Sequence, residues 1–592
     1  KKSNFKYYCS DWCRQNWHYE EQADLFYVPG MKQEKCTVCG KELLERQLKY
    51  CSKACYFAGR HNRKREITGA DIICECLLEQ GVDTVFGYPG GAALNTYDAL
   101  YKYSDKITHY MTAHEQGASH AADGYARSTG KTGVVIATSG PGATNLVTGI
   151  ATAYMDSVPM VAITGNVSTP LIGCDSFQEV YITGITMPIT KHNFVVRKVE
   201  DLADTLRDAF RIAASGRPGP VLVDIPKDIT AAKTTYFPKP KDNTPLRTDK
   251  VVGNLEEIAE LINRAERPFI YFGGGVRLSE ASDELRELIL KADIPAAYTL
   301  MAAGVLGYGE RNNLGLMGMH GNYSANCAAN RADVMIAIGT RFSDRVALNT
   351  QKFGHNAKIV HIDIDSAEIN KNITADYTII GDVKAVLRKM LPSIKQTKHD
   401  AWIANIEEWK KDDYIPEDSD ECLKPHFVIE TACKAAGKDA IFVTDVGQHQ
   451  MWAAQFIHHT KPRNFLTSGG LGTMGYGYGA AIGAKVANPD VPVIHFTSDG
   501  SFHMNMNELC TAVSYKIPVI TVILNNAVLG MVRQWQAVFY GRRFASSEPE
   551  RVTNYAKVAE GFGGVGYRCT TPAEFEEAMA KAMKAEGPVW IE

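Results

Sequence analysis

The segment from Ser498 to Asn526, SDGSFHMNMNELCTAVSYKIPVITVILNN, constrains the fold of this chain more than any other. Apolar strands are predicted at Val493–Phe496 and Pro518–Leu524, with a helical stretch between them. The first strand leads into Asp499-Gly500-Ser501 and the second into Asn525-Asn526. Because open α/β sheets bind ligands at the carboxyl ends of their strands, an acid and an amide are expected to meet there.

These side chains suit a phosphate held by a metal ion. Asp499 and Asn526 supply hard oxygen ligands for an octahedral Mg²⁺ completed by phosphate oxygens and water. Gly500 lets the backbone approach a phosphate, and Ser501 starts a helix and offers its amide. Taken alone, the tripeptide favours a plain strand-turn-helix capped by Asp499. The distance to the Asn-Asn pair, with residues 501–524 between, favours the metal site.

The composition indicates a soluble, multidomain chain. At 592 residues it is too long for one core, and three or four domains are expected. The net charge of −3 gives no electrostatic reason for nucleic acid or a membrane to be the main partner. No run of 18 apolar residues is present, and the start lacks the apolar core of a secretion signal. Most of the later cysteines are scattered through apolar segments, which favours reduced thiols and a cytoplasmic location.

Residues 1–65 form a cysteine-rich extension with a pattern of its own. Six of the 14 cysteines precede residue 56. Two pairs, Cys36 with Cys39 and Cys51 with Cys55, have the spacing of a tetrahedral structural Zn²⁺ site. Four reduced cysteines in an extension without metal are the alternative. The segment is too short to bury a large core, so a metal ion would supply much of its stability.

The remaining chain alternates apolar strands, helical patterns and glycine loops, which predicts parallel sheets with helices on both faces. We expect an α/β fold of three doubly wound domains behind the cysteine-rich module. Their predicted bounds are 66–231, 250–395 and 426–592. A segment rich in Pro, Lys and Thr, Lys233–Lys250, is expected to be a linker.

Glu115 follows a predicted strand and lies among small residues, in the sequence HEQGASHAADGYAR. A buried carboxyl there needs a partner. This segment and the Asp-Gly and Asn-Asn pairs together resemble the thiamin diphosphate (ThDP) enzymes. Ser498 stands where that family usually has a Gly. The resemblance implies that Glu115 hydrogen-bonds the aminopyrimidine ring and favours the imino tautomer that takes the proton from the thiazolium carbon.

The resemblance also implies a ThDP site shared between loops of the first and last domains. Met474 matches the bulky residue that bends ThDP, and Gly447, Gln448 and His449 match a diphosphate-binding loop. The full predicted ThDP set is Glu115, Pro89, Gly447, Gln448, His449, Gly472, Met474, Gly500, Ser501, Asn526, Gly530 and Met531. Mg²⁺ would be held by Asp499, Asn526 and the backbone carbonyl of Val528.

Further segments narrow the resemblance to the acetohydroxyacid synthases, also called acetolactate synthases. GCDSFQE at 173–179 and KHN at 191–193 are similar to segments of that family. Trp535 matches the residue that favours 2-oxobutyrate as second substrate, and Arg345 one near the pyruvate site. The implied catalytic and substrate-contacting residues are Glu115, Gly87, Phe177, Gln178, Lys227, Arg345 and Trp535.

The middle domain has glycine loops and acids at strand ends, which suit a dinucleotide. Its GGG at 273–275, taken alone, could be only a tight turn. With GTRFSDR and HIDIDSAEI it resembles the FAD domain of the biosynthetic enzymes, where FAD has no net redox task. The implied FAD contacts are Arg217, Gly273, Gly274, Gly275, Thr299, Leu300, His320, Gly339, Arg341, Asp344, Arg345, Asp363, Ile364 and Asp382.

The implied reaction is the decarboxylation of pyruvate on ThDP and addition of the hydroxyethyl carbanion to pyruvate or 2-oxobutyrate, in branched-chain amino-acid biosynthesis. The family's site lies between subunits, so a homodimer or homotetramer is expected, with a small regulatory subunit as a further partner. The family normally continues beyond the final strand with a tail over the cofactors, so incomplete closure is expected here. Two alternatives stay open: another ThDP and FAD enzyme such as a pyruvate oxidase, and a non-catalytic scaffold for the zinc module.

Overall fold

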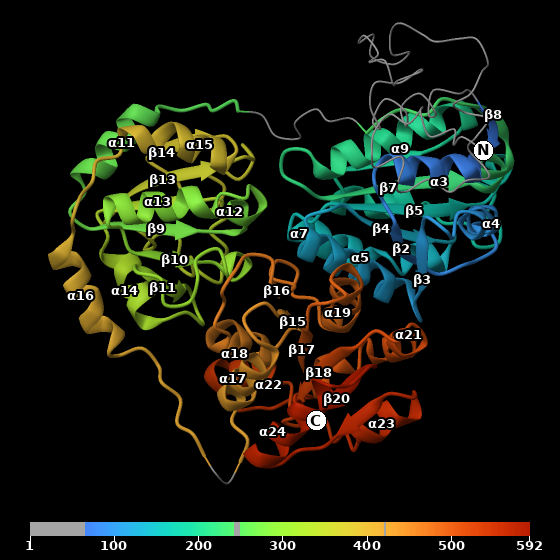
Figure 1. The fold of residues 1–592 in the computed structure, drawn as a ribbon. Coiled ribbons are helices and arrows are strands. Elements are labelled where there is room, and N and C mark those ends of the chain that lie inside the picture. Colours follow the sequence, from blue (N-terminus) through green and yellow to red (C-terminus); the bar gives the residue numbers. More distant parts are fainter. Residues whose placement is uncertain (1–64, 242–248, 420–421) are drawn as a thin grey trace, which may run out of the picture.

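Three six-stranded sheets organise the chain in a computed structural model that describes residues 65–241, 249–419 and 422–592. Every strand pairing within these three sheets is parallel, and helices connect the strands. Figure 1 shows the first domain at the upper right, the middle domain at the left and the last domain below them. Three parallel-sheet α/β domains were predicted, and this is confirmed. The predicted zinc ligands Cys36, Cys39, Cys51 and Cys55 lie outside the described residues.

The first domain has the strand order β3-β2-β4-β5-β7-β6. Its strands are β2 Thr84–Gly87, β3 Thr108–Met111, β4 Gly133–Ala137, β5 Met160–Asn166, β6 His192–Val195 and β7 Pro220–Pro226. Its helices are α3 Gly69–Glu79, α4 Leu94–Lys102, α5 Glu115–Thr129, α6 Pro141–Thr144, α7 Val147–Met155, α8 Ile182–Thr186, α9 Val199–Ala214 and α10 Lys227–Ala231. Residues of β4 and β7 are buried throughout, as expected for central strands covered on both faces.

The expectation that Lys233–Lys250 is only a linker was wrong at its start. Lys233–Tyr236 forms strand β8, which pairs antiparallel with β1, Arg65–Thr68. Tyr236 is 1% exposed and packs in the core of the first domain. The pairing with β1 and the buried ring of Tyr236 therefore hold this segment on the domain, although the surrounding Lys, Thr and Pro residues are typical of a loop.

The middle domain has the strand order β11-β10-β9-β12-β13-β14, which is the order of dinucleotide-binding domains. Its strands are β9 Pro268–Phe272, β10 Ala296–Tyr298, β11 Asn313–Leu316, β12 Val334–Ile338, β13 Lys358–Asp363 and β14 Tyr377–Ile380. Its helices are α11 Leu255–Arg264, α12 Gly274–Leu278, α13 Ser282–Ala292, α14 Tyr323–Arg331, α15 Val383–Met390 and α16 Asp400–Lys410. The strand order reverses between β9 and β12.

The last domain repeats the strand order of the first, as β16-β15-β17-β18-β20-β19. Its strands are β15 Ile441–Thr444, β16 Phe465–Leu466, β17 Val493–Ser498, β18 Val519–Leu524, β19 Val565–Tyr567 and β20 Val589–Ile591. Its helices are α17 Pro425–Ala436, α18 Gln448–Phe456, α19 Tyr476–Ala487, α20 Asp499–Phe502, α21 Leu509–Ser514, α22 Gly530–Phe539, α23 Tyr555–Gly561 and α24 Pro572–Ala582. Across the described ranges, the helices are too short or too polar to cross a bilayer.

Helices α5 and α19 join the first domain to the last, and Figure 1 shows them side by side. Glycines let their backbones approach closely. A Cβ atom on Gly124 would lie 2.0 Å from the carbonyl oxygen of Ala480, and one on Gly483 would lie 1.8 Å from that of Ala121. Any side chain at either position would collide with backbone that cannot move without separating the helices. The first and last domains are therefore held together by contacts that require glycine.

Replacing Gly124 with Ala should destabilise the protein by about 1 to 3 kcal/mol, because the added methyl group meets backbone and not a movable side chain. Gly561→Ala is the matched control, since a Cβ atom at that helical position meets nothing within 4 Å. Thermal unfolding of both variants measures the difference. Equal transition temperatures for the two variants would contradict the close approach of α5 and α19.

Candidate cofactor and active site

One cavity of about 1290 Å³ lies between the middle and last domains, with a strip of the first domain along its side. Most residues predicted to bind the two cofactors line it. From the FAD set these are Arg217, Gly273, Gly274, Gly275, Thr299, Leu300, His320, Gly339, Arg341, Asp344, Arg345, Asp363, Ile364 and Asp382. From the ThDP, metal and substrate sets these are Gly447, Gln448, His449, Gly472, Met474, Asn526, Val528, Gly530, Met531 and Trp535.

The middle domain lines one half of the cavity with the loops between β9 and α12 and after β12, where its strand order reverses. The loops after β9 and β12 meet there so closely that a Cβ atom on Gly273 would lie 2.4 Å from the carbonyl oxygen of Gly339. Asp363 ends β13, and burial raises its pKa to about 6. Glycine loops at a reversal point, with an acid at a neighbouring strand end, are the arrangement that binds dinucleotides. The residues present therefore fit the dinucleotide FAD.

Arg217 reaches this half of the cavity from the first domain. Its guanidinium group donates to a carboxylate oxygen of Glu368 at 2.7 Å and to one of Asp365 at 3.1 Å. Asp382, which also lines the cavity, accepts from the hydroxyl of Ser279 at 2.7 Å and caps helix α15. Polar groups from two domains thus surround the dinucleotide half.

The last domain contributes the other half of the cavity. Ser498 on β17 is paired with Leu524 on β18, so Asp499 and Asn526 leave the sheet at the same edge. Asp499 is 3% exposed, and its Oδ1 atom has no hydrogen-bond partner among the described residues. Burial raises the pKa of Asp499, and the backbone amides of Gly500 and Asn526 act against that rise. A buried carboxylate oxygen without a partner fits a cation, so this edge suits Mg²⁺.

Close packing places the loops around this edge. A Cβ atom on Gly530 would lie 2.0 Å from Oε1 of Gln448, and one on Gly500 would lie 2.6 Å from Cδ2 of Leu529. The hydroxyl of Ser501 accepts from the backbone amide of Gly475 at 3.1 Å, next to Met474. His449 is buried, and burial lowers its pKa to about 4, so the imidazole is neutral at pH 7.

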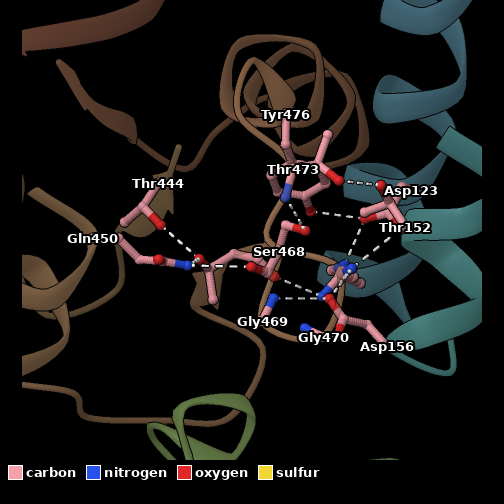
Figure 2. Close-up of polar contacts among 12 residues, drawn as sticks. Asp123, Thr152, Asp156, Thr444, Gln450, Ser468, Gly469, Gly470, Thr473 and Tyr476 are labelled. Atoms are coloured by element: carbon pink, nitrogen blue, oxygen red, sulfur yellow. Dashed lines mark hydrogen bonds and ion pairs between the residues drawn. The ribbon is translucent and has the colours of Figure 1, made fainter. Parts of the chain in front are cut away.

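The loop from Thr467 to Gly475, which carries Gly472 and Met474, is held by the first domain (Figure 2). Asp156 accepts from the backbone amides of Gly470 at 2.7 Å and Gly469 at 3.1 Å. The buried guanidinium group of Arg127 donates to Asp156 at 2.9 Å and to the carbonyl of Thr467 at 2.9 Å. The contacts with Thr467, Gly469 and Gly470 cross between the two domains, so the loop's position depends on both.

Two predicted substrate residues from different domains lie together at the cavity. The guanidinium carbon of Arg345 stands 5.9 Å from the ring centre of Trp535. Trp535 is 36% exposed, and its ring centre lies 4.9 Å from that of Phe539 at a tilt of 30°. A cation beside an exposed aromatic ring can hold a small carboxylate with an apolar tail.

Six predicted residues of the first domain do not line the cavity: Gly87, Pro89, Glu115, Phe177, Gln178 and Lys227. Glu115 begins α5, is 8% exposed and accepts from the side-chain amide of Asn145 at 2.9 Å. Phe177 is 88% exposed, and Lys227 is also exposed at the start of α10. Asp499, Gly500 and Ser501 of the last domain do not line the cavity either, although they directly follow its lining residue Ser498. The predicted site residues therefore lie in the cavity wall, directly behind it in the last domain, and on the first domain.

Known proteins match this chain along most of its length. Residues 67–185 match the thiamine pyrophosphate enzyme N-terminal TPP binding domain, 255–390 the central domain and 445–592 the C-terminal TPP binding domain. An acetolactate synthase large subunit of Mycobacterium tuberculosis is 47% identical over 534 residues, which is 88% of this chain and 86% of the relative. The isozyme 3 large subunit of Escherichia coli is 44% identical over 88% of this chain and 92% of its own length. The large subunit of Corynebacterium glutamicum is 46% identical over 90% of this chain and 88% of its own.

Glu508 is a functional candidate near Glu115 that sequence reasoning missed. It is fully buried at the start of α21, and its carboxylate accepts from the backbone amides of Ala113 and His114, both at 3.0 Å. The hydroxyl of Thr511 donates to it at 2.6 Å. A carboxylate of the last domain thus fixes the backbone that leads into Glu115. In the sequence, Glu508 has the appearance of an ordinary helix acid.

Glu508→Gln should loosen this backbone, because the side-chain NH₂ group replaces one of the two carboxylate oxygens. A hydrogen-bond donor then faces the backbone N–H of Ala113 or His114, which has lost its acceptor. The amides of Ala113 and His114 should exchange with deuterium roughly 10-fold faster than in the unsubstituted protein. Mass spectrometry of the peptide that contains them measures this rate. The matched control is Glu577→Gln, at an exposed position on α24 where the side chain pairs with Lys581. Unchanged exchange in Glu508→Gln would show that the contact does not hold the segment.

Proposed function

The chain belongs to the acetolactate synthase large subunits of the thiamine pyrophosphate enzymes, and we propose that its cavity binds ThDP, Mg²⁺ and FAD. As an acetolactate synthase it decarboxylates pyruvate and joins the remaining two-carbon unit to pyruvate or 2-oxobutyrate. This is the first common step of branched-chain amino-acid biosynthesis. The observation that carries the cofactor proposal is that ligand-binding loops of two domains, each at strand ends, open into one cavity.

In this proposal Asp499, Asn526 and the carbonyl of Val528 hold Mg²⁺, and the loop of Gly447, Gln448 and His449 receives the diphosphate. ThDP, when bound, supplies a nucleophilic carbon and a ring that accepts electrons during decarboxylation. The unpartnered Oδ1 of Asp499 supports the metal site, because a buried carboxylate oxygen without hydrogen bonds is costly. Met474 is proposed to bend the cofactor. Its place next to Gly475, whose backbone amide is held by Ser501, supports this role.

FAD is proposed for the half of the cavity that the middle domain lines. The reaction has no net redox step, so FAD would act by filling the cavity and supporting its walls. The strand order of this domain and the close approach of Gly273 to Gly339 support a dinucleotide there. Arg345 and Trp535 lie at the boundary of the two halves, which supports their proposed contact with the 2-oxoacids.

A second copy of the chain is proposed to complete each site. Glu115, Gly87, Pro89, Phe177, Gln178 and Lys227 would then face the cavity of the partner subunit. Exposed apolar side chains on both surfaces support this, namely Phe177, Tyr181 and Met187 on the first domain and Met504, Val538 and Phe539 on the last. The assembly would be a homodimer or a dimer of dimers. The name large subunit, carried by relatives, supports a small partner subunit as well.

The function is tested by incubating the protein with pyruvate, Mg²⁺ and ThDP, with and without FAD, and identifying the product. Acetolactate is expected, with a higher yield when FAD is present. Oxygen consumption with release of peroxide would instead support a pyruvate oxidase. Failure to bind ThDP would support the non-catalytic scaffold.

Glu115→Gln should lose most of the carboligation and still bind ThDP with Mg²⁺, because the proposed role of Glu115 is a hydrogen bond that sets the tautomer and not the attachment of the cofactor. The rate should fall by about 100-fold or more. Product formation and ThDP titration measure the two effects separately. Glu200→Gln, at an exposed position on α9, is the control. Unchanged turnover in Glu115→Gln would remove Glu115 from the mechanism.

A further inference from the structure

Arg277 is a buried cation for which the sequence suggested no role. It lies on α12, directly after the glycine loop at 273–275, and is 5% exposed. It lines the cavity, and its Nε atom has no hydrogen-bond partner. In the described part of the chain its guanidinium group forms no hydrogen bond or ion pair. A buried charge normally requires a partner, so this arrangement needs an explanation.

The groups around Arg277 do not supply that partner. The pKa of Arg277 is lowered to about 9, chiefly by burial and then by the guanidinium groups of Arg463 and Arg127, against an opposing effect of Asp156. Both carboxylate oxygens of Asp156 are already engaged by Arg127 and by the amides of Gly469 and Gly470. The acid that acts electrostatically on Arg277 is therefore committed to Arg127 and to the loop of the last domain.

Other cations at the cavity are in different situations. Arg217 is paired with Glu368 and Asp365. Arg345 lies beside Asp344 and is 64% exposed, so water solvates it. Arg277 combines burial, a place on the cavity wall and the lack of an anionic partner.

We propose that Arg277 binds the diphosphate of the flavin dinucleotide. The proposal rests on the FAD site proposed above. In dinucleotide-binding domains the glycine loop at the reversal of strand order is where the backbone approaches the pyrophosphate, and Arg277 follows that loop by two residues. A guanidinium group matches a diphosphate in charge and in hydrogen-bonding geometry. The ThDP diphosphate is assigned to loops of the last domain, which leaves the flavin diphosphate as the anion of the middle domain.

In this role Arg277 would strengthen FAD binding and lower the stability of the cofactor-free protein. Without FAD, Arg277 is a desolvated cation with no hydrogen-bonded anion, and an apolar side chain of similar length should be better tolerated. With FAD, the same cation gains a charged hydrogen bond in a region of low dielectric. One substitution should therefore change the two properties in opposite directions, which an ordinary structural arginine would not do.

The test compares Arg277→Met and Arg277→Lys with Arg264→Met, a control at an exposed position of α11 in the same domain. The affinities for FAD, ADP, riboflavin and ThDP are measured by titration, and the unfolding temperature is measured without cofactor. Arg277→Met should weaken FAD and ADP binding about 10-fold or more and leave riboflavin and ThDP binding unchanged. Its unfolding temperature without cofactor should rise by about 2 °C or more. Arg277→Lys should keep part of the FAD affinity, and the control should change neither property.

Several results would overturn this assignment. Equal FAD affinity in Arg277→Met and the unsubstituted protein would reject it and leave the FAD site intact. A selective loss of ThDP affinity would move Arg277 to the other cofactor. A lower unfolding temperature of the cofactor-free Arg277→Met protein would make Arg277 a structural cation. Absence of FAD binding by the unsubstituted protein would reject both this inference and the FAD site.

Discussion

The buried ion-pair network around Arg127 fixes the relation between the first and last domains, and the proposed site depends on it. Arg127 is 2% exposed. Its guanidinium group donates hydrogen bonds to Asp123 on its own helix and to Asp156, the residue that follows α7. The hydroxyl of Tyr476 donates to Asp123 at 2.7 Å, so the network continues into α19. Removing one partner would leave a buried charge uncompensated, at a cost of about 3 to 5 kcal/mol. The loop that carries Met474 keeps its position because all these groups are satisfied together.

The chemistry follows from where parallel strands end. In the last domain, β17 and β18 bring a carboxylate and an amide to one edge, and in the middle domain the loops after β9 and β12 meet at the reversal of strand order. Helices α5 and α19 hold the domains that carry these edges. The same packing keeps Glu115 on the first domain, bound to Asn145 and outside the cavity of its own chain. The two sets of proposed site residues therefore lie apart within one chain. This separation is consistent with the proposal that the first domain of one copy completes the cavity of a second copy.

Features encoded by local sequence could be predicted, and features that depend on distant contacts could not. The strands before Asp499 and Asn526, the glycine loop at 273–275 and the buried position of Glu115 follow from apolar runs, glycines and small residues that are neighbours in the chain. Strand β8 was missed because its one strong signal, Tyr236, acts through packing on α3 and α9. Glu508 and Arg277 were missed because a helical acid or base acquires a special role only when a remote backbone segment or cavity meets it.

The central claim is that each active site is built from two copies of the chain, and mixing two inactive variants tests it most directly. Glu115→Gln lacks the contribution of the first domain, and Asp499→Ala lacks that of the last. If sites are shared, dissociating and reassembling an equimolar mixture should restore about a quarter of the activity of the unsubstituted protein. Half of the dimers would then be hybrids with one intact site of two. A mixture that stays as inactive as its components would show that Glu115 and Asp499 serve the same site from one chain.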